Sequence, residues 1–418
     1  MRRLGASFGF LVLSLACRRE LEVTPRGDVA PAPGPREPAE MASGTPAAPL
    51  LGPLLAEIDA GAHARERTTI AAKAGERVRI PAGRFVAGSQ SGDEGRDPKL
   101  EPNSLVVDLA GYEIDRLPYP NDPKEPPRTD ATLKDAAKLC AERGERLCSE
   151  LEWEYACKGP AGDPFATGEA WDANCSREPA TCNSGAGALG MGTLREWTAS
   201  NVLPLEKDDA KLPAVRGAGV SAEPADHRCA HRMATSSTAH AKDLGFRCCA
   251  GPENAAQIPA PKLGPTARKI ALEPSQLAEI FATIPQLASV RQSIRYFAEP
   301  DDTATVLRKG KTAKGPADPE GFTLTTSPLL WNPAPGDELI VALGRGAKDS
   351  FIVALYRLPD NKYKLASSLL LVNDSGPFAL AYHPEVRERL LWSSCWKCTG
   401  EGGAVSLRDG RRVVVVQQ

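Results

Sequence analysis

The alternation of apolar and polar residues divides the chain into two parts with different predicted structures. The first part is predicted to contain four strands, at Arg77–Pro81, Arg84–Gly88, Leu105–Leu109 and Tyr112–Arg116, and a helix at Leu133–Arg143. In the second part, a predicted helix at Pro274–Ile284 precedes short apolar runs separated by Pro-Asp-Asn and Asp-Gly turns. These runs predict a β-meander with strands at Glu338–Leu343, Phe351–Leu358, Lys364–Val372, Phe378–Tyr382, Arg389–Ser393 and Val413–Gln417.

A second helix of the first part is predicted to begin after Ser149. Ser149 and Glu152 have the spacing of a capping box, in which each side chain bonds the other residue's backbone N–H. Glutamates at 150, 152 and 154 place negative charge near the helix start, where the helix dipole favours it. Trp153 and Cys157 lie four residues apart and share a face, so the pattern predicts an amphipathic helix with one buried side.

The N-terminal residues have the pattern of a bacterial secretion signal. Arg2 and Arg3 precede an apolar run, and a small residue precedes Cys17, which resembles a lipobox. We therefore expect a lipoprotein signal at residues 1–17 with Cys17 as the lipid-bearing residue; the alternative is a signal peptide cut nearby without lipidation. Residues 18–67 are rich in proline and alanine and are expected to be a flexible tether. These features predict an exported protein, lipid-anchored to a bacterial membrane and facing the periplasm or the cell surface.

Composition narrows the choice of partner and of stabilising chemistry. The 51 basic residues balance the 53 acidic ones and no basic run occurs, so a nucleic-acid partner is not expected. Of the 11 cysteines, ten remain once Cys17 is set aside. An even number of cysteines in an exported chain predicts a disulfide framework.

Six short motifs in one order resemble the formylglycine-generating enzyme (sulfatase-modifying factor) family over residues 76–252. They are Ile80–Ser89, Arg146–Glu154, Gly192–Thr198, Val215–Gly219, Arg228–Arg232 and Gly245–Cys249. The resemblance implies a C-type lectin-like domain at residues 68–252, followed by a linker at 253–268 and a mainly antiparallel β domain at 269–418 that resembles no family. The predicted fold class is therefore α+β.

The resemblance also implies two structural bridges, Cys140–Cys248 and Cys157–Cys229. Cys248 and Cys249 are adjacent, and neighbouring residues of a strand point to opposite faces, so Cys148–Cys249 is expected as a third bridge. Two local loop bridges are expected at Cys175–Cys182 and Cys395–Cys398. The latter pair has redox spacing, but it lacks the strand-to-helix context of a redox motif.

The catalytic chemistry of the resembled family is in doubt in this chain. Enzymes of that family bind copper through two cysteines shortly after an Arg-Gly-Gly-Ser segment and oxidise a substrate cysteine. The corresponding segment, Arg216–Cys229, has no cysteine between Gly217 and Arg228, and thiolates are what hold copper(I). We therefore expect a non-catalytic binding or scaffolding lipoprotein of the cell envelope, with a protein or peptide partner. The alternative is an enzyme of altered, metal-dependent oxidative chemistry.

Two metal hypotheses remain open, and no cofactor is firmly implied. The family's calcium site would use Asn174 and Glu196, although other donors are replaced; Glu196 could instead be a buried, hydrogen-bonded carboxylate beside Trp197. His227 and His231 are four residues apart, the spacing of a metal pair on a helix. The competing interpretation places both histidines in loops with ordinary hydrogen bonds.

Overall fold

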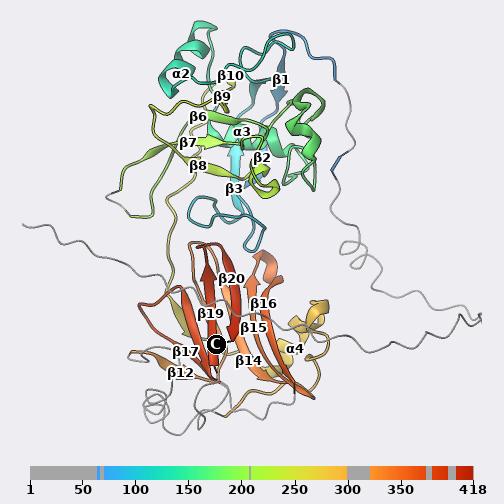
Figure 1. Ribbon diagram of the computed structural model, residues 1–418, viewed down its shortest axis with the longest axis vertical. Helices are drawn as coiled ribbons and strands as arrows, with labels where there is room; N and C mark the ends of the chain where they lie inside the picture. The colour runs from blue at the N-terminus through green and yellow to red at the C-terminus, as the bar shows by residue number, and fades with distance from the viewer. Residues whose placement is uncertain are drawn as a thin grey trace, which may run out of the picture. The chain divides into compact units, whose positions relative to one another are not determined.

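The computed structural model describes residues 64–65, 70–206, 209–298, 321–372, 379–393 and 402–417 (Figure 1). The described residues belong to one compact unit, Ala60–Gln418. Cys17, most of the expected tether and the Cys395–Cys398 pair lie outside the described residues; within the tether, Ala64 and Arg65 are described, and Arg65 pairs with Asp163. Among the described helices, none combines the length and the apolar character needed to cross a bilayer.

The first region, residues 70–252, contains three small antiparallel or mixed sheets. Its four-stranded sheet has the order β1 (Arg77–Ile80), β4 (Tyr112–Asp115), β10 (Cys248–Ala250), β5 (Arg146–Leu147). A ribbon pairs β2 (Gly83–Ala87) with β3 (Leu105–Leu109). The third sheet has the order β8 (Arg232–Ala234), β7 (Leu212–Arg216), β6 (Arg195–Val202), β9 (Leu244–Phe246), with β9 parallel to β6. The four strands predicted before residue 117 are confirmed as β1 to β4.

Two helices complete the first region, and both begin at a capping box, which the sequence analysis predicted for the second of them. Thr132 and Asp135 form a capping box at the start of α2 (Leu133–Glu142), and Ser149 and Glu152 form one at the start of α3 (Glu150–Lys158). The prediction that α3 buries only one side is wrong, because all nine of its residues are buried. The helix lies amid β2, β6 and β7 (Figure 1), and its charged side chains are paired inside the protein instead of facing solvent.

Four disulfides hold the first region together, with the pairings that the sequence analysis expected. They are Cys140–Cys248, Cys148–Cys249, Cys157–Cys229 and Cys175–Cys182. The adjacent cysteines of β10 point to opposite faces of the sheet, and Cys248 lies in the core cluster around Trp197 while Cys249 lies in the cluster around Trp153. The two bridges therefore join β10 to α2 on one face and to the start of α3 on the other.

The second region, from residue 267 on, has two five-stranded antiparallel sheets. One has the order β11 (Ala267–Lys269), β13 (Leu329–Trp331), β14 (Leu339–Arg345), β15 (Asp349–Arg357), β16 (Tyr363–Val372). The other has the order β12 (Thr323–Thr325), β17 (Ala379–Tyr382), β18 (Arg389–Ser393), β19 (Gly402–Arg408), β20 (Arg412–Gln417). The expected antiparallel β architecture is confirmed; the sequence analysis missed β11, β12, β13 and β19.

The strand β14 shows why this region reads as unbroken apolar runs. Leu339, Val341 and Leu343 belong to the cluster shared with the other sheet. Ile340 and Ala342 belong to the cluster under α4 (Pro274–Ala282), which packs on the opposite face. Because a strand presents alternate residues to its two faces, a strand buried on both sides needs apolar residues at every position.

The segment expected to be a linker has no helix or strand before β11, but it is packed against the first region. Asn254 accepts a hydrogen bond from the Ala110 N–H at 2.7 Å and donates one to Glu152 at 2.8 Å. Ile258 is buried within the core of the first region. The chain therefore leaves the first region along its surface, with anchored contacts.

Candidate functional site

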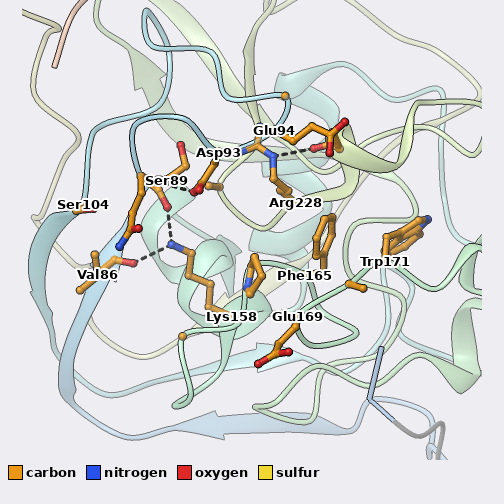
Figure 2. A pocket seen from close by; sticks show the side chains of 18 of the residues that line it. Val86, Ser89, Asp93, Glu94, Ser104, Lys158, Phe165, Glu169, Trp171 and Arg228 are labelled. Atoms are coloured by element: carbon orange, nitrogen blue, oxygen red, sulfur yellow. Dashed lines mark hydrogen bonds between the residues drawn. The ribbon is translucent and has the colours of Figure 1, made fainter. Parts of the chain in front are cut away.

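A cleft of about 1490 Å³ opens beside α3 (Figure 2). One wall is the end of β2 and the loop that follows it, residues 84–95. The facing wall is the end of α3 and the loop up to residue 171, together with residues 223–230. Arg411 and Arg412, at the tip of the β19–β20 hairpin, also line the cleft. We call this feature the cleft throughout.

The two buried cations of the cleft are already bound by the protein. Lys158 Nζ donates to the carbonyl oxygens of Val86 (Figure 2) at 2.8 Å and Gly88 at 2.6 Å. It also pairs with Glu154 at 2.9 Å. Arg228 makes a two-pronged contact with Glu101, at 2.7 and 2.9 Å. Both cations therefore hold the walls of the cleft in place, and neither is free to bind an anion.

Three carboxylates at the surface of the cleft differ from the two buried cations, because they are unpaired within the described residues. Glu94, Glu169 and Glu223 are exposed, and each lacks an ion-pair partner within the described part of the chain. One exposed cation, Arg412, is likewise unpaired there, whereas Arg411 lies 3.1 Å from Asp97. The charge available to a ligand is therefore mainly negative, which favours a ligand with a positively charged group.

Aromatic rings form the apolar part of the cleft. Phe165 and Trp171 lie next to each other (Figure 2), with their ring centroids 6.5 Å apart. Behind Trp171, the His227 ring stacks in parallel at 4.1 Å, and its Nδ1–H donates to the Gly192 carbonyl oxygen at 2.7 Å. Trp171 is thus supported from behind by a fixed ring, and its indole is held in place as a contact surface for a ligand.

A buried network of charges lies behind Lys158. Arg216 contacts Glu150 at 3.2 Å and Glu154 at 2.9 Å, and Arg232 contacts Glu150 at 2.7 Å. Burial by itself raises the pKa of Glu154, but Lys158 and Arg216 overcome this effect and hold the pKa below its usual value. The network keeps α3 charged and fixed next to the cleft.

The segment that would carry the catalytic cysteines in the resembled family forms part of the cleft wall. Residues 223–226 of this segment line the cleft, and Cys229 at its end is bridged to Cys157. The eight cysteines of the described residues are all bridged, and none lines the cleft. The described part of the cleft therefore offers no thiolate for a copper ion.

The structure does not bring Asn174 and Glu196 together as calcium ligands. Glu196 is fully buried, with its carboxylate bound by Trp153 Nε1 and by Arg247 Nε, each at 3.0 Å. Asn174 is exposed in the short 3-10 helix Ala173–Ser176 and donates to Asp172 at 2.9 Å. The alternative interpretation, a buried and hydrogen-bonded carboxylate, therefore describes Glu196, and the guanidinium of Arg247 supplies the positive charge.

The two histidines do not form a metal pair on a helix. His227 ends a 3-10 helix, Pro224–His227, and the backbone is extended at Arg228, so helical spacing is lost before His231. His231 lies 3.9 Å from Asp226, and burial lowers the pKa of its imidazole. Within the described residues, the one cluster with metal-ligand spacing is Asp115, Glu145 and Cys248; its cysteine is bridged and both carboxylates are paired with Arg143.

The sequence analysis missed the aromatic part of the site. It gave Phe165 and Trp171 no role. Two large aromatic rings in a polar loop were the available signal, because such residues are rarely left in loops without a contact to make. His227, which stacks on Trp171, was considered either as a metal ligand or as a histidine with ordinary hydrogen bonds, and its bond to the Gly192 carbonyl oxygen fits the second interpretation.

Comparison with known proteins agrees with this geometry. Residues 116–251 match the family model of the sulfatase-modifying factor enzyme 1-like domain. The chain is 29% identical over 151 residues to the inactive C-alpha-formylglycine-generating enzyme 2 of Mus musculus, covering 30% of this chain and 49% of that protein. It is 27% identical over 152 residues to the protein of the same name from Bos taurus, covering 30% of this chain and 50% of that protein.

The chain thus spans about half the length of these curated relatives. Among solved structures, it is similar to PvdO from Pseudomonas aeruginosa, with 18% identity and a TM-score of 0.35, covering 44% of this chain and 98% of that chain. The match to the family model assigns residues 116–251 of this chain to a sulfatase-modifying factor enzyme 1-like domain.

Proposed function

We propose that this protein is a non-catalytic binding module whose cleft takes up a peptide segment carrying a basic side chain. The observation that carries the proposal is the combination of an open cleft with cysteines that are all bridged within the described residues. Copper(I) chemistry needs thiolates, and a bridged sulfur cannot act as one. The two curated relatives are themselves named as inactive members of the family, which supports the loss of catalysis.

The lining of the cleft supports the chemistry of this ligand. Trp171 offers an indole supported by His227, and an indole face attracts cations as well as apolar groups. Glu94, Glu169 and Glu223 supply unpaired negative charge nearby. A lysine or arginine side chain satisfies both requirements, because its stem is apolar and its end is positively charged.

The binding test uses a peptide containing Cys-x-Pro-x-Arg, titrated into the purified protein while tryptophan fluorescence is followed. Trp171→Ala should weaken binding about tenfold, since an aromatic contact to a cation is worth about 1–2 kcal/mol. Glu169→Gln should weaken it less, and Glu253→Gln, an exposed glutamate that does not line the cleft, should leave it unchanged. Equal affinity of the wild type and Trp171→Ala would reject the cleft as the binding site.

Elemental analysis of the purified protein distinguishes the binding proposal from its rival, an enzyme with metal-dependent chemistry. A stoichiometric transition metal that is lost in a His227→Phe, His231→Phe variant would favour the rival. Under the binding proposal no such metal is found, because His227 is engaged by Trp171 and Gly192.

We further propose that the module acts at the cell envelope, anchored through a lipid on Cys17. The support is the signal-like N-terminal sequence and the disulfide framework, which forms in oxidising compartments. Replacing Cys17 with Ser should release the mature protein from the membrane fraction. A variant that stays in that fraction unchanged would contradict lipidation at Cys17.

A further inference from the structure

We infer that Asp337, in the second region, is a positioning residue for the cleft: it holds the cleft's wall loop, residues 88–104, through a buried contact with Arg96. The inference rests on the proposed binding function of the cleft and adds a role for the second region. The wall loop connects β2 to β3, and its residues Ser89, Gln90, Asp93 and Glu94 line the cleft.

Asp337 lies between β13 and β14 and reaches the wall loop at two points. Its carboxylate accepts from Ser91 Oγ at 2.6 Å and from Arg96 Nη1 at 2.7 Å. The contact is buried, since Asp337 is 2% and Arg96 is 4% exposed. In the same place Asn103 donates to the Gly336 carbonyl oxygen at 2.8 Å.

The contact continues from Arg96 to the cleft through Glu101. Arg96 approaches the Glu101 carbonyl oxygen at 3.4 Å, and Ser89 donates to the Glu101 carboxylate at 2.6 Å. The same carboxylate binds Arg228, whose Nε donates to the Ala225 carbonyl oxygen at 2.8 Å. Asp337, Arg96, Glu101 and Arg228 thus form a buried series of contacts that ends in the cleft lining, with an ion pair at each end and a hydrogen bond from Arg96 to the Glu101 backbone between them.

The backbone of the wall loop is fitted to the second region as well. Gly92 has a φ of 82°, and a Cβ at this position would lie 2.6 Å from Cδ2 of Tyr356 in β15. Only glycine allows both this conformation and this close approach. Together with the Asp337 contacts, this packing fixes the side of the loop that faces away from the cleft.

Removing the charge of Asp337 is expected to release the wall loop, because a buried charge without a partner is costly. Arg96 Nε already lacks a hydrogen-bond partner, and Asp337 is the one carboxylate bound to its guanidinium within the described residues. Removing the charge of Asp337 leaves Arg96 buried without compensation, and the arginine is expected to leave its position. The wall loop then loses its buried ionic attachment to the second region, and the arrangement of Ser89, Asp93 and Glu94 at the cleft is expected to loosen.

The test measures two quantities in Asp337→Asn and in the milder Ser91→Ala. The first is amide hydrogen exchange of residues 89–104, which needs no ligand. The second is the affinity of the cleft for the peptide containing Cys-x-Pro-x-Arg. Asp337→Asn should speed exchange in the wall loop at least tenfold and weaken the peptide about tenfold, with Ser91→Ala intermediate in both. The control is Glu338→Gln, which removes the exposed partner of Arg357 next to Asp337 and should change neither quantity.

The outcomes separate the two proposals. Faster exchange in the wall loop together with no peptide binding by the wild type would reject the proposed ligand and support the role of Asp337. Wild-type exchange of residues 89–104 in both variants, or peptide affinity unchanged while the loop is mobile, would overturn the inference. Exchange of the β14 and β15 amides reports whether the second region itself stays folded, and a general loss of protection there in both variants would assign Asp337 to stability alone.

Discussion

The two regions of this protein are stabilised by different means. The first region contains the four described disulfides and nearly all of the buried charges, including Glu150, Glu154, Arg216 and Arg247. The described part of the second region has one buried charged residue, Asp337, and two sheets packed through a continuous apolar core. The region with long loops is held by covalent and ionic links, and the region with regular strands is held by apolar packing.

The difference has a physical origin. Loops cannot alternate apolar and polar residues over long stretches, so they bury little apolar surface and gain little from the hydrophobic effect. Bridges restrict the unfolded chain, and buried ion pairs fix side chains in one geometry. A cleft lined by loops therefore keeps its shape in the first region, and the second region can supply a stable support for its wall.

The largest predicted effect is that of reducing the four disulfides of the first region. Each bridge contributes about 2–4 kcal/mol, so losing all four should unfold the first region. Hydrogen exchange measured with and without reductant should show loss of protection in α2, α3 and β6, while β14 and β15 remain protected. Equal loss of protection in both regions would contradict the claim that the first region depends on its disulfides more than the second region does.

The second-largest effect is expected from removal of the buried charge of Arg216. Arg216→Leu leaves Glu150 and Glu154 without their shared partner and should cost about 3–5 kcal/mol in the free energy of unfolding of the first region. Chemical denaturation followed by fluorescence measures this loss. The control Arg357→Leu removes an exposed ion pair and should cost little. A loss below about 1 kcal/mol for Arg216→Leu would show that the network is dispensable.

A smaller effect is expected from a methyl deletion in the second region. Ile352 is fully buried in β15 between the two sheets, and Ile352→Val should cost about 1 kcal/mol. The loss should appear in the unfolding of the second region and should persist under reducing conditions. If reduction abolished it, the second region would depend on the bridges of the first.

The smallest effect concerns pH. The pKa of Glu154 is held below its ordinary value of 4.5 in the folded protein, so the unfolded chain binds the proton more tightly. The stabilisation is therefore present above about pH 4.5 and is lost as the pH falls through the folded value. The free energy of unfolding of the wild type should fall more steeply below pH 4.5 than that of Glu154→Gln. Parallel curves for the two proteins would contradict this assignment.

Local patterns in the sequence predict much of the framework. The capping box at Ser149 and the strands β1 to β4 follow from residues close together in the chain. The burial of α3 does not, because its partners Arg216 and Arg232 lie 62 residues beyond Glu154 and 82 residues beyond Glu150. The glutamates of α3 look like a solvent-exposed face until the fold brings these arginines to them.

The candidate site, like the framework, is predicted by the sequence only where local patterns determine it. The sequence shows that no cysteine lies between Gly217 and Arg228, and this absence predicts the loss of the resembled family's chemistry. The stacking of His227 on Trp171 and the reach of Asp337 to Arg96 join residues 56 and 241 positions apart, and no local pattern marks either contact. What the sequence could not supply was the set of contacts between distant loops.

The proposal that the cleft binds a peptide without the chemistry of the resembled family is tested most directly by a turnover measurement. The purified protein is incubated with copper, oxygen, a reductant and a peptide containing Cys-x-Pro-x-Arg, and the peptide is examined by mass spectrometry for conversion of its cysteine to an aldehyde. The account predicts binding of the peptide with conversion no greater than in a control without protein. Conversion well above that control would contradict the account, and it would mean that a cysteine assigned to a bridge is free to act.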